Sequence, residues 1–183
     1  MSKIGRKPID ISNVQVDVKG SEVSYKGANS SGQYFLPELF EAKIAGKKLT
    51  LVPNAKMAES LKSRDLNCVW GMHRALLANA IVGSKNEFEK LIEINGLGYK
   101  VVQSGVNLVF TLGYSHKIDF KLPKKVSVSI DRSGQKLTVK SSDRELLGKV
   151  CDKICSLRRP EPYKGTGIKL STEHIIRKAG KTK

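Results

Sequence analysis

The sequence predicts an α+β fold made of two small domains duplicated in tandem, each a mostly antiparallel sheet with one main helix packed on one face. Two observations predict it. In both halves of the chain, short segments with apolar residues at alternate positions are separated by glycine turns, and one segment with helical spacing follows. In addition, Gly46–Leu51 and Gly134–Val139 share Gly, Lys, Leu and Thr at a constant offset of 88 residues, which indicates an internal duplication.

These patterns divide the chain into three parts. We expect an N-terminal α+β repeat in residues 1–83, a C-terminal α+β repeat in residues 84–170 and a basic tail in residues 171–183. Short glycine turns favour antiparallel strands, and a single amphipathic helix in each half covers one face of its sheet.

The first repeat begins with strands and ends with a helix. Alternating apolar residues predict strands at Val14–Val18, Val23–Tyr25, Tyr34–Leu36 and Lys48–Val52, the last closed by Pro53 and Asn54. A helix follows whose apolar face holds Leu66, Val69, Trp70, His73, Leu77, Ala80 and Ile81, and Gly83 is expected to end it. Trp70 and His73 are interpreted as structural residues of that face.

The second repeat has the same order of elements. Strands are predicted at Leu91–Ile94, Tyr99–Val102, Val106–Phe110, Val126–Ile130 and Lys136–Val139. Ser142, with Glu145 three residues later, predicts a capping box at the start of a helix. The apolar face of that helix is expected to hold Leu147, Val150, Cys151 and Ile154, and Pro160 bars its continuation.

The chain carries a large positive charge that is concentrated toward its C-terminal end. Its 183 residues include 33 Lys and Arg against 17 Asp and Glu, a net charge of +16. Residues 1–83 hold 12 basic and 7 acidic residues, residues 84–183 hold 21 and 10, and residues 156–183 alone hold 8 and 2. Such an excess repels itself unless a polyanion neutralises it. A polyanionic partner of the second repeat is therefore expected.

The composition also argues against several other classes of protein. Cys68, Cys151 and Cys155 cannot all pair within one chain, which indicates a reducing compartment such as the cytoplasm. Residues 1–8 have positive charge but no apolar run behind them, so a signal peptide is not expected. No stretch approaches the roughly 18 apolar residues of a membrane-spanning helix. We expect no membrane partner.

No cofactor, metal or catalytic group is predicted. Gly96 and Gly98 resemble the start of a dinucleotide fingerprint, but the third glycine is missing and a strand follows, so a hairpin turn is expected and no small-molecule substrate. Cys151 and Cys155 lack two further ligands at zinc-binding spacing, and Cys151 is interpreted as a core thiol. No motif links any two of His73, His116 and His174, and His116 is expected in a turn.

The segment from Arg158 to Lys169 is the most unusual in the chain. Pro160 and Pro162 fix two φ angles, while Gly165 and Gly167 permit close approach of the backbone to a partner. Its basic residues are suited to phosphates and its tyrosine ring to stacking on a base: Arg158, Arg159, Lys164, Lys169 and Tyr163. We interpret the segment as an RNA-contacting loop; the alternative is a solvated basic connection.

The tail carries further positive charge and has little to bury. Basic extensions of this kind order when they thread between nucleic-acid backbones. Arg177, Lys178 and Lys181 are therefore candidate RNA contacts. The alternative for the last residues is an ordinary solubilising terminus.

Five segments in order give the chain a resemblance to a known family. The opening nine residues, the helix segment His73–Gly83, the turns Gly96–Lys100 and Leu112–His116, and the segment Arg159–Gly165 followed by Gly167 and Ile168 are similar to large-subunit ribosomal protein six of the bacterial type. The sequence departs from that family's pattern at Thr166, where a basic residue is general, and at Leu170, where an aromatic one is frequent.

The resemblance implies a structural role without catalysis. It implies a monomer within the large subunit of the cytoplasmic ribosome, bound to 23S-type rRNA near the sarcin-ricin loop and the base of the acidic stalk, with neighbouring large-subunit proteins as further partners. The loop and tail residues named above would contact the RNA. Two alternatives stay open: an RNA-processing enzyme acting on rRNA, and a basic adaptor for acidic proteins or anionic membranes, which the lack of a basic amphipathic helix disfavours.

Overall fold

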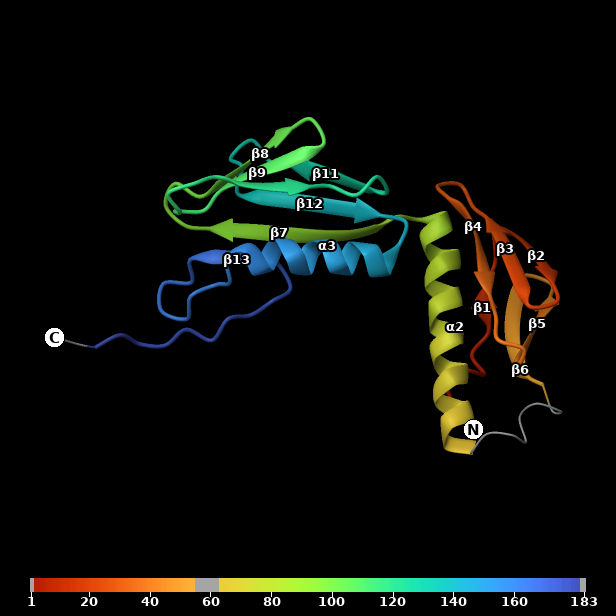
Figure 1. Cartoon of the computed structure of the whole chain (residues 1–183). Coiled ribbons are helices and arrows are strands. Elements are labelled where there is room, and N and C mark those ends of the chain that lie inside the picture. The colour runs from red at the N-terminus through yellow and green to blue at the C-terminus, as the bar shows by residue number, and fades with distance from the viewer. Residues whose placement is uncertain (1, 55–62, 182–183) are drawn as a thin grey trace. The chain divides into compact units, whose positions relative to one another are not determined.

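Antiparallel sheets and two described helices make up the computed structural model, which describes residues 2–54 and 63–181 (Figure 1). The chain divides into two units, Met1–Glu87 and Phe88–Lys183. Each unit is α+β and contains its own sheets, its own helix and its own apolar core. The predicted fold class is confirmed. Neither described helix is long and apolar enough to cross a membrane.

The first unit contains two three-stranded sheets and one long helix. One sheet has the order β2-β3-β4 and the other the order β1-β6-β5. The elements are β1 (Ile9–Asp10), β2 (Gln15–Lys19), β3 (Glu22–Lys26), β4 (Ser31–Phe35), β5 (Phe40–Ala45), β6 (Lys48–Pro53) and α2 (Ser63–Lys85). Sequence reasoning missed β1 and β5. β1 is only two residues long, and β5 alternates weakly because only its first residue, Phe40, is buried.

The core of the first unit forms between its sheets and α2. Val23, Leu49, Leu77 and Ile81 are almost fully buried there. Trp70 is also buried, and its indole Nε1 donates a hydrogen bond to the Leu51 carbonyl over 3.1 Å, which confirms its predicted place in the core. Burying such a ring requires a partner for its N–H, and the β6 backbone supplies one.

His73 also has a structural environment on α2. Its Nδ1 lies 2.8 Å from the Tyr34 hydroxyl, and its ring centroid is 6.0 Å from that of Phe40. Burial lowers the pKa of His73, because a charged ring is poorly solvated there. The interpretation of His73 as a structural residue fits these contacts.

The helix α2 ends at Lys85, two residues beyond the glycine expected to end it. Gly83 is buried inside the last turn, so it is not a terminating glycine. The Ser84 carbonyl accepts a hydrogen bond from the Asn29 amide over 2.9 Å, and Gly27 leaves room for this contact because a Cβ there would lie 2.3 Å from the Ser84 oxygen. The β3–β4 turn therefore satisfies the helix end.

The second unit contains a four-stranded sheet, a three-stranded sheet and one helix. The sheet orders are β11-β12-β7-β13 and β10-β9-β8, with all pairs antiparallel. The elements are β7 (Phe88–Asn95), β8 (Lys100–Ser104), β9 (Asn107–Thr111), β10 (Ile118–Lys121), β11 (Val126–Ile130), β12 (Lys136–Ser141), α3 (Arg144–Leu157) and β13 (Gly167–Leu170). Strand β10 was not predicted, and β13 lies where the sequence indicated a loop.

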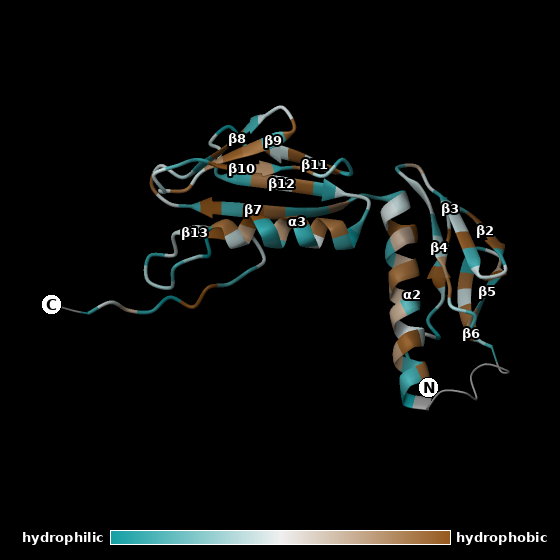
Figure 2. Cartoon of the chain, viewed as in Figure 1, coloured by the Kyte–Doolittle hydropathy of each residue, from teal (hydrophilic) through white to brown (hydrophobic). Residues whose placement is uncertain are grey.

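The helix α3 packs along β7, β12 and β13 through its predicted apolar face. Leu147, Val150, Cys151 and Ile154 are all buried, as expected from their spacing. Polar and apolar residues alternate along the helix in Figure 2, as a half-buried helix requires. The helix ends at Leu157, before Pro160.

The cap of α3 differs from the predicted capping box. Asp143, not Ser142, is the N-cap residue: its φ is −102° and its ψ 112°, and its carboxylate accepts hydrogen bonds from the amides of Glu145 and Leu146. Both residue types cap helices, but a carboxylate at this position also interacts favourably with the positive end of the helix dipole. The helix thus starts one residue later than the Ser-x-x-Glu pattern indicated.

The two units use the repeated segment in the same way. Gly46 and Gly134 both adopt positive φ, of 61° and 68°, in the turns that lead into β6 and β12. Lys48 then pairs in register with Asp10 of β1, and Lys136 with Glu93 of β7. A helix follows in each unit. The second unit alone adds a strand after its helix within the described residues.

The position of the helix cap yields a test. Asp143→Ala removes the acceptor of two amide hydrogen bonds and is expected to lower the free energy of unfolding by about 1 kcal/mol. Ser142→Ala is the matched control and is expected to change it by less than about 0.5 kcal/mol. Urea unfolding monitored by circular dichroism compares the two; equal losses would contradict the assigned cap.

Candidate nucleic-acid interface

The loop between α3 and β13 is closed on itself by backbone hydrogen bonds. The Ile168 amide donates to the Arg158 carbonyl over 2.9 Å and joins the two ends. Inside the loop, the Glu161 amide donates to Thr166 and the Gly165 amide donates to Glu161, each over 2.9 Å. Residues 159–166, named here the proline loop, therefore form a braced projection rather than a loose connection.

Two glycines make this closure possible. Gly167 has φ +140°, and a Cβ there would lie 2.6 Å from the Pro160 Cα and 2.7 Å from the Arg159 carbonyl oxygen. Gly165 has φ +72°, and a Cβ there would lie 3.0 Å from the Arg177 guanidinium. Side chains are disfavoured in this conformation and would occupy filled space. The sequence predicts close approach of the backbone to a partner at both glycines. In the structure, the groups that lie close to them belong to the chain itself.

The basic tail lies against the proline loop. The Lys178 amide donates a hydrogen bond to the Pro162 carbonyl over 3.0 Å, and the Arg177 guanidinium packs against Gly165. In the sequence, the loop and the tail are two separate basic segments. A single backbone hydrogen bond and a glycine contact bring them together, and neither has a sequence signature. The last two residues of the tail lie outside the described residues.

The assembled surface is cationic and exposed. Five basic side chains belong to it, and the described part of the chain gives none of them an ion-pair partner: Arg159, Lys164, Arg177, Lys178 and Lys181. Tyr163 stands among them with 54% of its surface exposed, and Pro162 is exposed as well. Positive charges beside an exposed aromatic ring suit a phosphate backbone with accessible bases.

Two predicted site residues have partners inside the unit. The Arg158 guanidinium lies over the rings of Tyr99 and Tyr114 and donates a hydrogen bond to the Leu112 carbonyl. Lys169 lies on β13, where its Nζ is 3.3 Å from the Glu93 carboxylate. These contacts anchor the two ends of the proline loop. Pro160, half-buried against Gly167, belongs to the same base.

The two departures from the resembled family pattern have structural roles. The Thr166 hydroxyl donates a hydrogen bond to the Glu161 carboxylate over 3.2 Å, which adds a side-chain link across the loop. Leu170 packs against the core of the second unit. Thr166 therefore stabilises the loop itself, and Leu170 stabilises the strand that follows it.

Potential metal ligands and thiols are the other chemically relevant groups among the described residues. No group of three potential ligands among them is placed to hold a metal ion. Cys151 is buried, as predicted, and burial raises its pKa; burial also raises the pKa of Cys155 to about 11. These thiols are therefore protonated near neutral pH and poor as nucleophiles or ligands.

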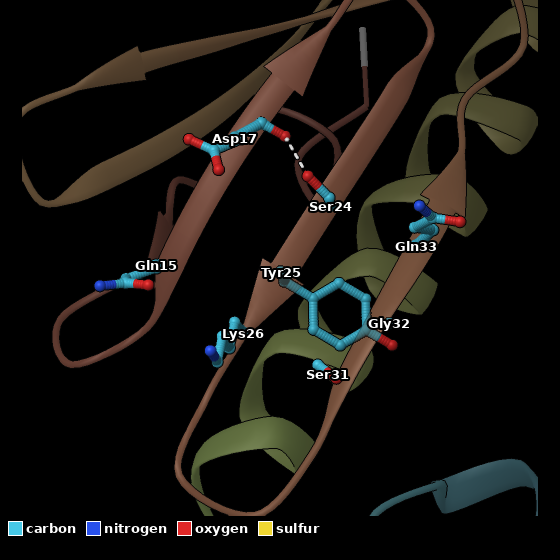
Figure 3. A pocket seen from close by; sticks show the side chains of 8 residues that line it. All are labelled: Gln15, Asp17, Ser24, Tyr25, Lys26, Ser31, Gly32 and Gln33. Atoms are coloured by element: carbon cyan, nitrogen blue, oxygen red, sulfur yellow. Dashed lines mark hydrogen bonds between the residues drawn. The ribbon is translucent and has the colours of Figure 1, made fainter.

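The first unit offers a hollow of different character. An open pocket with a volume of about 380 Å³ lies on the β2-β3-β4 sheet (Figure 3). In it the Tyr25 ring covers Gly32, and the Ser24 hydroxyl donates a hydrogen bond to the Asp17 carbonyl over 3.3 Å. Its lining has one lysine, Lys26, and one acid, Asp17. These two charges cancel, so the hollow lacks the excess of positive charge that the proline loop and the tail carry.

Comparison with known proteins gives matches along the whole chain. The family model described as ribosomal protein L6 matches residues 95–170, a range that includes α3, the proline loop and β13. Proteins called large ribosomal subunit protein uL6 are similar at full length. Those of Desulfatibacillum aliphaticivorans and Campylobacter hominis are 40% and 38% identical over 183 residues, covering all of this chain and 99% and 98% of theirs.

A third relative of the same name, from Bartonella quintana, is 36% identical over 184 residues and covers both chains completely. Identity at this level extends across both units, and the family match includes the proline loop and the strand that follows it, whereas the tail lies beyond the match. On this basis the chain belongs to the uL6 family of large-subunit ribosomal proteins.

Proposed function

We propose that this protein is a structural component of the large ribosomal subunit of the cytoplasmic ribosome that binds 23S-type rRNA near the sarcin-ricin loop and the base of the acidic stalk. The observation that carries the proposal is the junction of the proline loop and the tail, which gathers five exposed cations and Tyr163 on one unit. The role is architectural and not enzymatic, with the protein present as a monomer beside neighbouring large-subunit proteins.

The contacts divide into two kinds. Arg159, Lys164, Arg177, Lys178 and Lys181 neutralise phosphates and supply most of the affinity through release of counterions. Tyr163 stacks on a base or sugar. Phosphate contacts hold the protein in register on the RNA, while the shape of the loop decides which RNA fold it fits.

The remaining predicted site residues maintain that shape. Pro160, Pro162, Gly165 and Gly167 set the path of the backbone. Arg158 and Lys169 anchor the ends of the loop to Leu112 and Glu93. We propose that these residues act by preorganising the loop, which lowers the entropic cost of ordering it on the RNA.

The cationic surface predicts a salt dependence that can be assigned to single residues. If the five exposed cations each neutralise one phosphate, log K for an rRNA fragment carrying the sarcin-ricin loop falls with log salt at a slope of about −3.5 to −4.5. Lys164→Ala and Arg177→Ala are each expected to weaken binding and to reduce that slope by about 0.7 to 0.9.

Lys47→Ala is the matched control, because Lys47 is an exposed lysine of the first unit, as Lys164 is of the second. It is expected to leave both affinity and slope nearly unchanged. Filter binding at several salt concentrations measures all three variants. If Lys47→Ala causes the same loss as Lys164→Ala, the binding is generic charge attraction and the loop is not the site.

The shape of the loop predicts the effect of filling Gly167. Gly167→Ala places a Cβ against the Pro160 backbone in a φ that L residues disfavour, so it is expected to cost more than about 1 kcal/mol of stability and to weaken RNA binding. Gly180→Ala is the control, because nothing lies within 4 Å of its Cβ. Thermal unfolding and RNA titration test both; wild-type behaviour of Gly167→Ala would refute the braced loop.

A further inference from the structure

Four side chains of the second unit form one continuous stack. The Arg158 guanidinium carbon lies 5.2 Å from the centroid of the Tyr99 ring and 4.7 Å from that of Tyr114. The Tyr114 ring in turn stacks on His116, with 6.0 Å between centroids and 19° between planes. The contacts therefore run from Tyr99 through Arg158 and Tyr114 to His116, and His116 is the last member of the series.

The inner members of the stack are held in place by the backbone. Gly96 and Gly113 both adopt positive φ, and a Cβ at either would lie within 3 Å of a Tyr99 ring carbon, so two turns close on that ring. The Tyr114 hydroxyl donates to the Leu157 carbonyl over 3.3 Å, and Arg158 donates to Leu112. The stack is built before any partner arrives.

The outer end of the stack faces solvent. His116 is exposed, Tyr114 is 44% exposed, and the neighbouring Lys117 is exposed too. Among the described residues, His116 has no ring contact other than Tyr114 and no hydrogen bond. The stack thus ends in the exposed imidazole ring of His116, and the next residue in the chain is the cation Lys117.

We infer that the His116 ring is a stacking platform for an unpaired RNA base, which continues the pile Tyr99–Arg158–Tyr114–His116 by one layer. This inference rests on the proposed RNA-binding function and adds a base contact to its phosphate contacts. Every base has a flat π-face, and proteins hold unstacked bases on aromatic and guanidinium planes. Lys117 follows His116 in the chain and is exposed, so we include it as the cation for the phosphate of the same nucleotide.

The stack is also connected to the proline loop. Arg158 contacts both tyrosine rings of the stack, and its carbonyl closes the loop by accepting a hydrogen bond from the Ile168 amide. A base on His116 and phosphates on the loop would thus be held at a fixed spacing by one residue. That coupling favours an RNA base over an isolated protein side chain as the partner of His116.

The test uses the full-length protein and the same rRNA fragment, titrated at several salt concentrations. His116→Ala is expected to weaken binding roughly 5- to 150-fold at every salt concentration and to leave the salt slope unchanged, because stacking releases no counterions. His116→Phe keeps a flat ring without charge and is expected to bind within about 3-fold of wild type. Lys117→Ala is the control for charge: Lys117 adds a sixth phosphate contact to the five of the loop and tail, so its removal is expected to reduce the slope by about 0.7 to 0.9.

The outcomes separate this inference from the proposed function. If wild type binds the fragment and His116→Ala binds equally well, the platform is wrong while the RNA-binding role stands; a protein partner of His116 would give this result. If His116→Phe is as weak as His116→Ala, His116 acts by charge or hydrogen bonding, and stacking is refuted. If wild type itself does not bind the fragment, the proposed function fails first. Unchanged thermal unfolding of the variants shows that each still folds.

Discussion

The pairing of β13 with β7 is the interaction on which the cationic surface depends. Gly167, Ile168 and Lys169 lie in register with Asn95, Ile94 and Glu93, so the chain returns to the sheet directly after the proline loop. Ile168 is fully buried, and its amide closes the loop onto Arg158. A short strand with one buried side chain thus turns a proline- and glycine-rich segment into a fixed shape, against which the tail can lie.

The duplicated fold explains why only one unit carries that surface. Both units share the glycine turn, the strand that follows it and the pairing of an acid with the lysine that begins the strand. The additional strand β13 and the loop before it come after the shared elements, so they extend the second unit without disturbing the common core. The excess charge follows this difference: residues 84–183 hold 21 basic and 10 acidic residues, against 12 and 7 in residues 1–83.

Much of the fold was predictable from local patterns, whereas the joining of distant segments was not. The apolar faces of both helices are predicted by residue spacing alone. Leu77 and Leu147 are buried because apolar residues three and four positions apart lie on the same side of a helix. Strand β13 was not predicted, because four residues beginning with Gly167 have little strand character without β7 as a partner. The cap at Asp143 was not predicted because Ser142, with Glu145 three residues later, fits the capping-box pattern and Asp143 does not. The contact of the tail with Pro162 was not predicted because the backbone makes it.

The central claim is that the proline loop and the tail meet the RNA as one surface. Ultraviolet cross-linking of the protein to rRNA within large ribosomal subunits, with the linked peptides identified by mass spectrometry, tests it most directly. Cross-links are expected to be concentrated in residues 159–166 and 171–181, including Tyr163. Cross-links concentrated in residues 2–54, with the loop and tail unlinked, would contradict it.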